Sequence, residues 1–284
     1  MKTPQLKIEG RSGCPIRLSE LNGQISVIKT SSGVEYNSRL KKQIEKQLQF
    51  TTNELTSIGF FSPQVFEFNT TDELYWFNME YVSGLKYSTY LTSKHKEAIE
   101  QVIHKFKTYF KHLFHQAILI EAPKEMINQK LQQLNEKVEA TYESAIFKAA
   151  LASLKSIPEH PLYIGKCHGD FTLSNMLFLS SGKICAFDLL DSFIESPLMD
   201  WVKLKQDITF KWSIHVENEQ ETNQTKLIQV LNYIDRELSS SFSQDNVIKE
   251  WEQYLQIFNL MRIVPYAKDP RDITFLENTI LKLL

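Results

Sequence analysis

Three residues with oxygen-bearing side chains, Asp170, Asn175 and Asp188, stand at spacings that could support phosphoryl transfer. The first two lie in CHGDFTLSNMLF, residues 167–178, and the third lies in AFDLLD, residues 186–191. In that chemistry one carboxylate accepts the proton of the attacking hydroxyl, while an amide oxygen and a second carboxylate hold Mg²⁺ on the nucleotide phosphates. Each residue alone is more often a turn or capping residue, but together they favour the chemical interpretation.

The elements around these residues would hold them near one another. Two short apolar runs, NMLFL and KICAFDLL, are joined by Ser180-Ser181-Gly182. This pattern predicts a small β-hairpin within residues 161–190. Asp170 and Asn175 would lie on the loop before it, and Asp188 would lie at the strand end that folds back beside that loop.

The segment HGDFTLSN, with the later FD, resembles the HGDxxxxN…D core of the aminoglycoside phosphotransferase and choline kinase family. These enzymes are small-molecule relatives of the protein kinases. The resemblance implies an ATP- and Mg²⁺-dependent phosphotransferase in which Asp170 is the catalytic base and Asn175 and Asp188 are metal ligands. It also matches Asp200, in SPLMDW, to a family aspartate that braces the catalytic loop.

The N-terminal third contains candidates for nucleotide binding. Val27-Ile28-Lys29 resembles the strand element in which a lysine holds the α- and β-phosphates of ATP. Because strand side chains alternate, Val27 shares a face with Lys29 and would line the adenine pocket. Glu45 is the candidate for a helix carboxylate that pairs with Lys29. A solvated Glu45 paired with a neighbouring lysine is the alternative, and Glu54 is a weaker competitor.

The segment MEYVSG, residues 79–84, resembles the linker between the two lobes in this family. Backbone groups of Glu80 and Val82 would then bind the adenine edge. The sequence pattern changes at the same place, from strands with one helix to mostly helical periodicity. We therefore expect a two-lobed, protein-kinase-like α+β fold. Residues 1–82 would form an antiparallel sheet with one helix, and residues 83–284 a larger helical lobe for catalysis and substrate binding.

Local signals define the N-terminal elements. Asn22-Gly23, between PIRLSEL and QISVIKT, predicts a tight β-hairpin. Apolar residues at i, i+4 and i+8 predict a helix over about residues 37–53. The runs QVFEFN and ELYWFNMEYV predict a second hairpin. The loop EGRSGCP lacks the GxGxxG signature, so Arg11 and Ser12 are either phosphate contacts or part of a solvated turn.

Composition narrows the classes of partner. The chain has 284 residues, with 32 Lys and Arg against 34 Asp and Glu, a formal net charge of −2. This balance gives no electrostatic footprint for a nucleic acid or an anionic membrane surface. The three cysteines form no CxxC pair, and no apolar run approaches the ~18 residues of a membrane helix. We expect a cytoplasmic protein whose partner is a small molecule with a hydroxyl group.

The sequence does not identify the phosphate acceptor. A nucleotide-binding regulator without strong activity is one alternative. The four residues that catalysis would need are nevertheless present: Lys29, Asp170, Asn175 and Asp188. An aminoglycoside-inactivating kinase would need an acidic rim, for which Asp191, Glu195 and the acids of residues 217–221 are candidates. Cations in the same half of the chain count against it: Lys203, Lys205 and Arg262. The run FDLLDSFIESPLMDWVKLKQD resembles bacterial phosphotransferases associated with capsule or surface polysaccharide synthesis, which would favour a sugar or polyol.

Overall fold

The computed structural model describes residues 7–9, 14–217 and 224–284. The chain divides into two units. The first reaches Tyr90 and also contains Asn175–Asp191, and the second contains Leu91–Ser174 and Ser192–Leu284. The first unit is thus larger than the lobe expected over residues 1–82. The reason is that Leu85 bridges to Phe178, and the Tyr90 ring stacks on Phe178 at a centroid distance of 4.9 Å.

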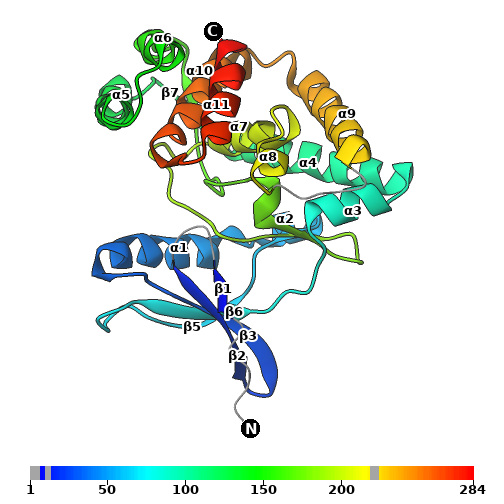
Figure 1. Ribbon diagram of the computed structural model, residues 1–284. Helices are drawn as coiled ribbons and strands as arrows, with labels where there is room; N and C mark the ends of the chain where they lie inside the picture. Colours follow the sequence, from blue (N-terminus) through cyan, green and yellow to red (C-terminus); the bar gives the residue numbers. More distant parts are fainter. Residues whose placement is uncertain (1–6, 10–13, 218–223) are drawn as a thin grey trace. The chain divides into compact units, whose positions relative to one another are not determined.

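The main sheet of the first unit is antiparallel throughout, in the order β1-β2-β3-β6-β5 (Figure 1). Its strands are β1 (Lys7–Glu9), β2 (Pro15–Leu21), β3 (Gln24–Thr30), β5 (Val65–Asn69) and β6 (Trp76–Glu80). Asn22 and Gly23 join β2 to β3 with φ angles of 51° and 79°. The two positive φ values are those that the Asn-Gly signal predicts, so the hairpin is confirmed.

One face of this sheet packs against a helix. Helix α1 (Asn37–Phe50) follows the short 3-10 turn η1 (Val34–Tyr36). Its residues Leu40 and Ile44 form an apolar cluster with Phe77 of β6. The expected helix over residues 37–53 ends earlier, at Phe50, and a separate helix α2 (Asn53–Ser57) follows, capped by the side chain of Thr52.

A second, smaller sheet in the first unit carries the expected hairpin. Strands β9 (Met176–Phe178) and β10 (Ile184–Ala186) pair antiparallel, as the sequence predicts. Strand β4 (Phe60–Phe61) joins β10 in parallel, giving the order β4-β10-β9. The β4 pairing links positions more than 120 residues apart in the sequence, and no local pattern announces it.

The second unit is mainly helical. Helix α3 (Tyr87–Ser93) spans the point in the chain where the first unit ends. The 3-10 turn η2 (Leu173–Asn175) ends at Asn175, where the chain returns to the first unit. The other elements of the second unit, in chain order, are α4 (Lys96–Gln116), β7 (Ile118–Ile120), α5 (Lys124–Glu139), α6 (Ala145–Ser153), β8 (Leu162–Ile164), α7 (Pro197–Ile208), α8 (Trp212–Glu217), α9 (Gln224–Phe242), α10 (Asn246–Met261), η3 (Val264–Tyr266) and α11 (Pro270–Leu281).

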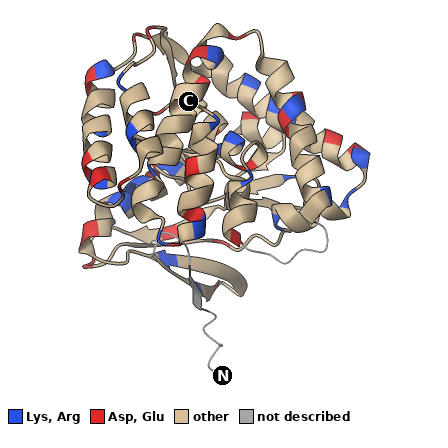
Figure 2. Ribbon diagram, turned by 45° about the horizontal axis from the view of Figure 1, so that its top comes forward, with Lys and Arg blue, Asp and Glu red and all other residues tan. Residues whose placement is uncertain are grey.

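The core of the second unit is aromatic. Phe110 contacts Phe171, Trp201 and Phe242 edge to face, and Tyr109 stacks on Phe171 at 4.4 Å. Basic and acidic residues both occur on the helices of this unit (Figure 2). Among the described residues, no helix is long and apolar enough to cross a membrane.

Gly84 tests the close packing of the segment 81–84 on β9. A Cβ at this position would lie 2.9 Å from the Leu177 Cβ and 3.4 Å from the Phe178 carbonyl oxygen. Gly84→Ala should therefore lower the free energy of unfolding by about 1 kcal/mol or more, as overpacking does. The measurement is denaturant unfolding of the whole chain.

Gly33→Ala is the matched control. There the three atoms nearest to the added Cβ belong to the carboxylate end of Glu35, a flexible side chain. Its free energy of unfolding should change little, because Gly→Ala also restricts the unfolded chain. Equal losses in the two variants would contradict the close approach.

Candidate active site

Lys29 is the buried cation of the first unit. Lys29 is 3% exposed. Its partner across the β3–β6 ladder is Phe77, which belongs to the apolar cluster between α1 and the sheet. Lys29 therefore lies on the helix-covered face of the sheet, together with Val27, whose partner is Met79. The shared face of Val27 and Lys29 is as expected from strand alternation. A buried ammonium needs an anion, and Lys29 Nζ donates to Asp188 Oδ1 at 2.5 Å.

The β9–β10 hairpin holds Asp188 beside Asn175. Met176 faces Ala186 in the ladder, and the next residue, Phe187, donates its N–H to the Asn175 carbonyl at 3.0 Å. Asp188 follows with φ of 61°, a left-handed conformation that is uncommon outside glycine. This backbone lets the carboxylate meet Lys29 directly after the strand ends.

The donor set of Asn175 and Asp188 fits Mg²⁺. Mg²⁺ prefers hard oxygen ligands and keeps several waters, so one carboxylate and one amide oxygen suffice on the protein side. In the described part of the chain, no three His, Cys, Asp or Glu side chains gather as a metal cluster. A magnesium site at the end of this hairpin would use only two protein ligands, Asn175 and Asp188.

The expected Lys29–Glu45 pair is wrong. Glu45 is exposed on α1, and the ammonium pairs with Asp188 instead. The helix face explains this result. Ile44 packs toward the sheet, and Glu45, one residue further, is rotated by about 100° away from it.

Two lysines connect α1 to the segment after Asp188. Lys42 lies 3.0 Å from the Asp191 carboxylate, and Lys46 donates to the Leu190 carbonyl at 2.6 Å. The helix thus contacts this segment through two cations. Asp191 therefore pairs with Lys42 of α1, a contact that no sequence pattern indicated.

The linker candidates lie where β6 ends. Glu80 is the last residue of β6 and donates its N–H to the Gln64 carbonyl at 2.8 Å, while its carboxylate accepts from Gln64 N. Val82 follows in irregular backbone and is partly exposed. The roles of both in adenine binding remain predictions. The loop residues Arg11 and Ser12 lie outside the described residues.

In the second unit, Asp200 fixes the backbone just before Asp170. Its carboxylate accepts from His168 N and Gly169 N, each at 2.7 Å, and from the Tyr109 hydroxyl at 2.8 Å. Burial and the neighbouring carboxylate hold the pKa of Tyr109 well above its usual value, so the hydroxyl stays a donor. Gly169 has φ of 88°, where a side chain would be strained.

Asp207 fixes the same loop on the other side of Asp170. It is 1% exposed, and its carboxylate accepts from Leu173 N at 2.7 Å and from Ser213 N and Oγ at 3.1 and 2.7 Å. Burial raises the pKa of Asp207 to about 6, against the lowering effect of these hydrogen bonds; the nearby charge of Asp170 adds a smaller increase.

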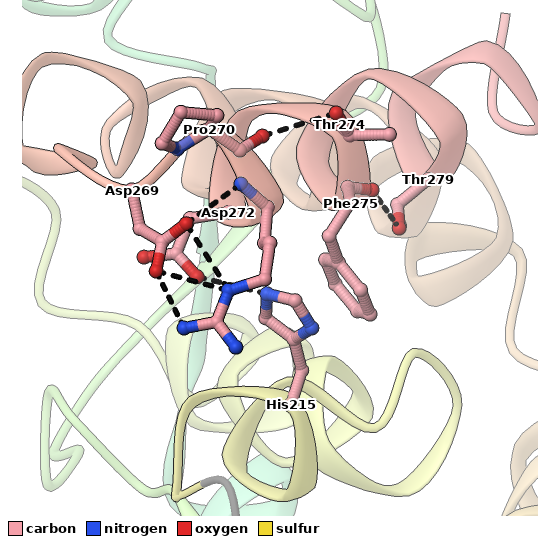
Figure 3. Close-up of polar contacts among 8 residues, drawn as sticks. His215, Asp269, Pro270, Asp272, Thr274, Phe275 and Thr279 are labelled. Carbon is pink, nitrogen blue, oxygen red and sulfur yellow. Dashed lines mark hydrogen bonds and ion pairs between the residues drawn. The ribbon is translucent and has the colours of Figure 1, made fainter.

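Helix α8, which supplies Ser213, is itself anchored to α11. His215 of α8 lies 2.8 Å from Asp272 and stacks on Phe275 at 4.3 Å (Figure 3). Arg271 pairs with Asp269 beside it and holds the pKa of that carboxyl down at about 2. The support of the loop therefore extends from Asp207 through α8 to the start of α11.

Asp170 itself is in contact with a lysine. Lys203 Nζ lies 3.0 Å from Asp170 Oδ1, and the Asp170 side chain is 23% exposed. The next residue, Phe171, is fully buried against Tyr109. The loop thus combines a fixed backbone with a carboxylate that solvent can reach.

Sequence reasoning missed Asp207 and Lys203. Both lie on α7 with Asp200, at i, i+3 and i+7 in DWVKLKQD, so they share one helix face. That spacing was the available signal. It became informative only once Asp200 was placed against the loop.

Solved structures of small-molecule kinases have the same fold, whereas no protein-family model and no curated protein sequence matches the chain. The choline kinase LicA from Streptococcus pneumoniae is 12% identical, with 100% of this chain and 94% of that chain covered and a TM-score of 0.60. The aminoglycoside phosphotransferase APH(4)-Ia, in a ternary complex with ADP and hygromycin B, is 12% identical, with coverages of 99% and 94% and a TM-score of 0.62. APH(2")-IIa, in a complex with streptomycin and ATP, is 13% identical, with coverages of 99% and 91% and a TM-score of 0.58. The expected protein-kinase-like α+β fold is thereby confirmed.

The raised pKa of Asp207 predicts a pH-dependent contribution to stability. A carboxyl whose pKa is higher in the folded chain than in the unfolded chain stabilises the fold fully below about pH 4 and loses this contribution as the pH rises through about 6. Between pH 5 and 7.5 the wild-type free energy of unfolding should fall by about 1 kcal/mol relative to that of Asp207→Asn. Denaturant unfolding of both proteins at several pH values measures the difference. Parallel curves would show that the carboxylate is not buried as described.

Proposed function

We propose that this protein is an ATP- and Mg²⁺-dependent phosphotransferase that transfers the γ-phosphoryl group of ATP to a hydroxyl group of a small molecule. The observation that carries the proposal is the Asp170 loop. Two buried carboxylates, Asp200 and Asp207, fix its backbone on both sides, and the Asp170 carboxylate is left partly exposed. A general base needs this combination, because its position must be fixed while the acceptor hydroxyl can reach it.

Each candidate residue has one role in the proposal. Asp170 accepts the proton of the acceptor hydroxyl. Lys29 binds the α- and β-phosphates, and Val27, with backbone groups of Glu80 and Val82, holds the adenine. Asn175 and Asp188 would hold Mg²⁺, which supplies positive charge to neutralise the phosphates.

The pairing of Lys29 with Asp188 supports these roles. The ammonium of a lysine that is 3% exposed needs an anion beside it, and Asp188 provides one. Nucleotide phosphates offer Lys29 a second anion. Asp188 can then turn its oxygens to the metal, and neither charge is left uncompensated.

The solved neighbours support the phosphotransferase chemistry in general terms. They are a choline kinase and two aminoglycoside phosphotransferases, the latter two in complexes with ATP or ADP. For the acceptor we favour a neutral hydroxyl compound such as a sugar or polyol, with amino alcohols next. Lys203, at 3.0 Å from the base, neutralises negative charge that would otherwise attract a polycationic aminoglycoside.

An acceptor screen tests the proposal directly. ATP consumption should be measured with Mg²⁺ against sugars, polyols, amino alcohols and aminoglycosides. We expect turnover with a member of the first three classes. No turnover with any acceptor, although MgATP binds, would favour the alternative of a nucleotide-binding regulator.

Asp170→Asn tests the base. The substitution should lower kcat by roughly 10²- to 10⁴-fold, the usual contribution of a general base. The affinity for MgATP should stay close to that of the wild type, since the base contacts the acceptor. Steady-state kinetics and calorimetry measure the two quantities. A variant with wild-type kcat would remove Asp170 from this role.

Lys29→Ala tests the nucleotide site, with Glu45→Gln as the matched control. Loss of a charged hydrogen-bond donor should weaken MgATP binding by roughly 10-fold or more. Glu45→Gln should leave the affinity unchanged, because Glu45 is exposed and does not pair with Lys29. Calorimetric titration gives both values. Comparable losses in the two variants would restore the helix carboxylate as the partner of Lys29.

A further inference from the structure

One face of α7 presents three charged side chains to the loop around Asp170. Asp200, Lys203 and Asp207 are spaced i, i+3 and i+7, so at 3.6 residues per turn they form one stripe along the helix. The two carboxylates accept backbone N–H groups on either side of Asp170. The cation between them meets the Asp170 side chain itself.

The two lysines of α7 have different surroundings. Lys203 Nζ lies 3.0 Å from Asp170 Oδ1, with side-chain exposures of 14% and 23%. Lys205 points toward α9 and α10. Its ammonium pairs with Asp235, lies 3.7 Å from the Glu252 carboxylate and donates a hydrogen bond to the Ser239 hydroxyl. Lys205 thus ties helices together, whereas Lys203 contacts only the loop carboxylate among the ion pairs of the described residues.

Two further groups near Asp170 set its electrostatic surroundings. Burial raises the pKa of Asp207 on α7, and the nearby charge of Asp170 adds a smaller increase. His168 accepts the Asp170 N–H at Nδ1, 3.3 Å away, so it contacts the backbone. Without a cation, Asp170 would face the negative charge of Asp207. Lys203 offsets this repulsion at the carboxylate.

We propose that Lys203 is a positioning residue for the reaction proposed above, on which this inference rests. Its ammonium fixes the orientation of the Asp170 carboxylate and keeps it ionised, so that the carboxylate can accept the hydroxyl proton. An ion pair at 3.0 Å between two partly buried groups is strong enough for both effects. The fold therefore supplies backbone position and side-chain position to Asp170 from one helix.

The kinetic test compares Lys203→Met, Lys203→Arg and Lys107→Met in the full chain. Lys107 is the matched control, because it pairs with Glu237 at 3.3 Å elsewhere in the second unit. Lys203→Met should lower kcat by roughly 10- to 100-fold, the effect of a misplaced catalytic group, with MgATP affinity unchanged. Lys203→Arg should retain most of kcat, and Lys107→Met should match the wild type. A thermal melt of each variant shows whether it is folded.

A second readout does not depend on turnover. The carboxyl carbon resonance of Asp170, assigned by its loss in Asp170→Asn, is titrated without nucleotide in the wild type, Lys203→Met and Lys107→Met. The titration midpoint should move to higher pH in Lys203→Met alone. If the wild type transfers phosphate to no acceptor, the proposed function fails, and this titration still decides the role of Lys203. A folded Lys203→Met with wild-type kcat, or with an unmoved titration, overturns the inference.

Discussion

The structure around the candidate base depends on carboxylates that accept the backbone N–H groups of an irregular loop. The backbone N–H groups of His168, Gly169 and Leu173 donate to side-chain carboxylates, and leaving such buried groups unpaired would be costly. Asp200 and Asp207 accept them from one helix. Because both carboxylates are almost fully buried, each needs these donors as much as the loop needs the acceptors. Helix and loop are therefore mutually dependent, and the position of Asp170 follows from the position of α7.

The first unit meets the same constraint with the opposite charge. Lys29 is buried on the helix-covered face of the sheet, and its ammonium requires an anion. The β9–β10 hairpin supplies Asp188 at its end, in a left-handed conformation. The hydrogen bond between Phe187 and Asn175 fixes where that end lies. A strand lysine and a hairpin aspartate, 159 residues apart in the sequence, thus form one charged pair.

Sequence patterns with short range predicted their elements well. The Asn22-Gly23 turn, the β9–β10 hairpin and the shared face of Val27 and Lys29 all follow from neighbouring residues, and the structure contains them. The predicted Lys29–Glu45 pair is not found, because the prediction required the rotational phase of α1, and because the partner of Lys29, Asp188, is distant in sequence. Leu40 and Ile44 determine which side of α1 faces the sheet, and Glu45 lies outside that side.

The charged residues on one face of α7, Asp200, Lys203 and Asp207, show why sequence motifs do not identify every functional residue. The motif SPLMDW assigns a role to Asp200, whereas no motif assigns one to Lys203 or Asp207, and their roles follow from helical spacing. The alternating signs along the stripe have a physical reason. Burial is the main cause of the raised pKa of Asp207, and the negative charge of Asp170 adds a smaller increase. A lysine between the two acids on the helix offsets this repulsion at Asp170. A chain with an apolar residue at 203 would keep the loop backbone in place through Asp200 and Asp207 but would leave the base carboxylate without its cation. Fixing a loop and preparing its carboxylate for proton transfer are thus separate tasks, and α7 performs both from a single face.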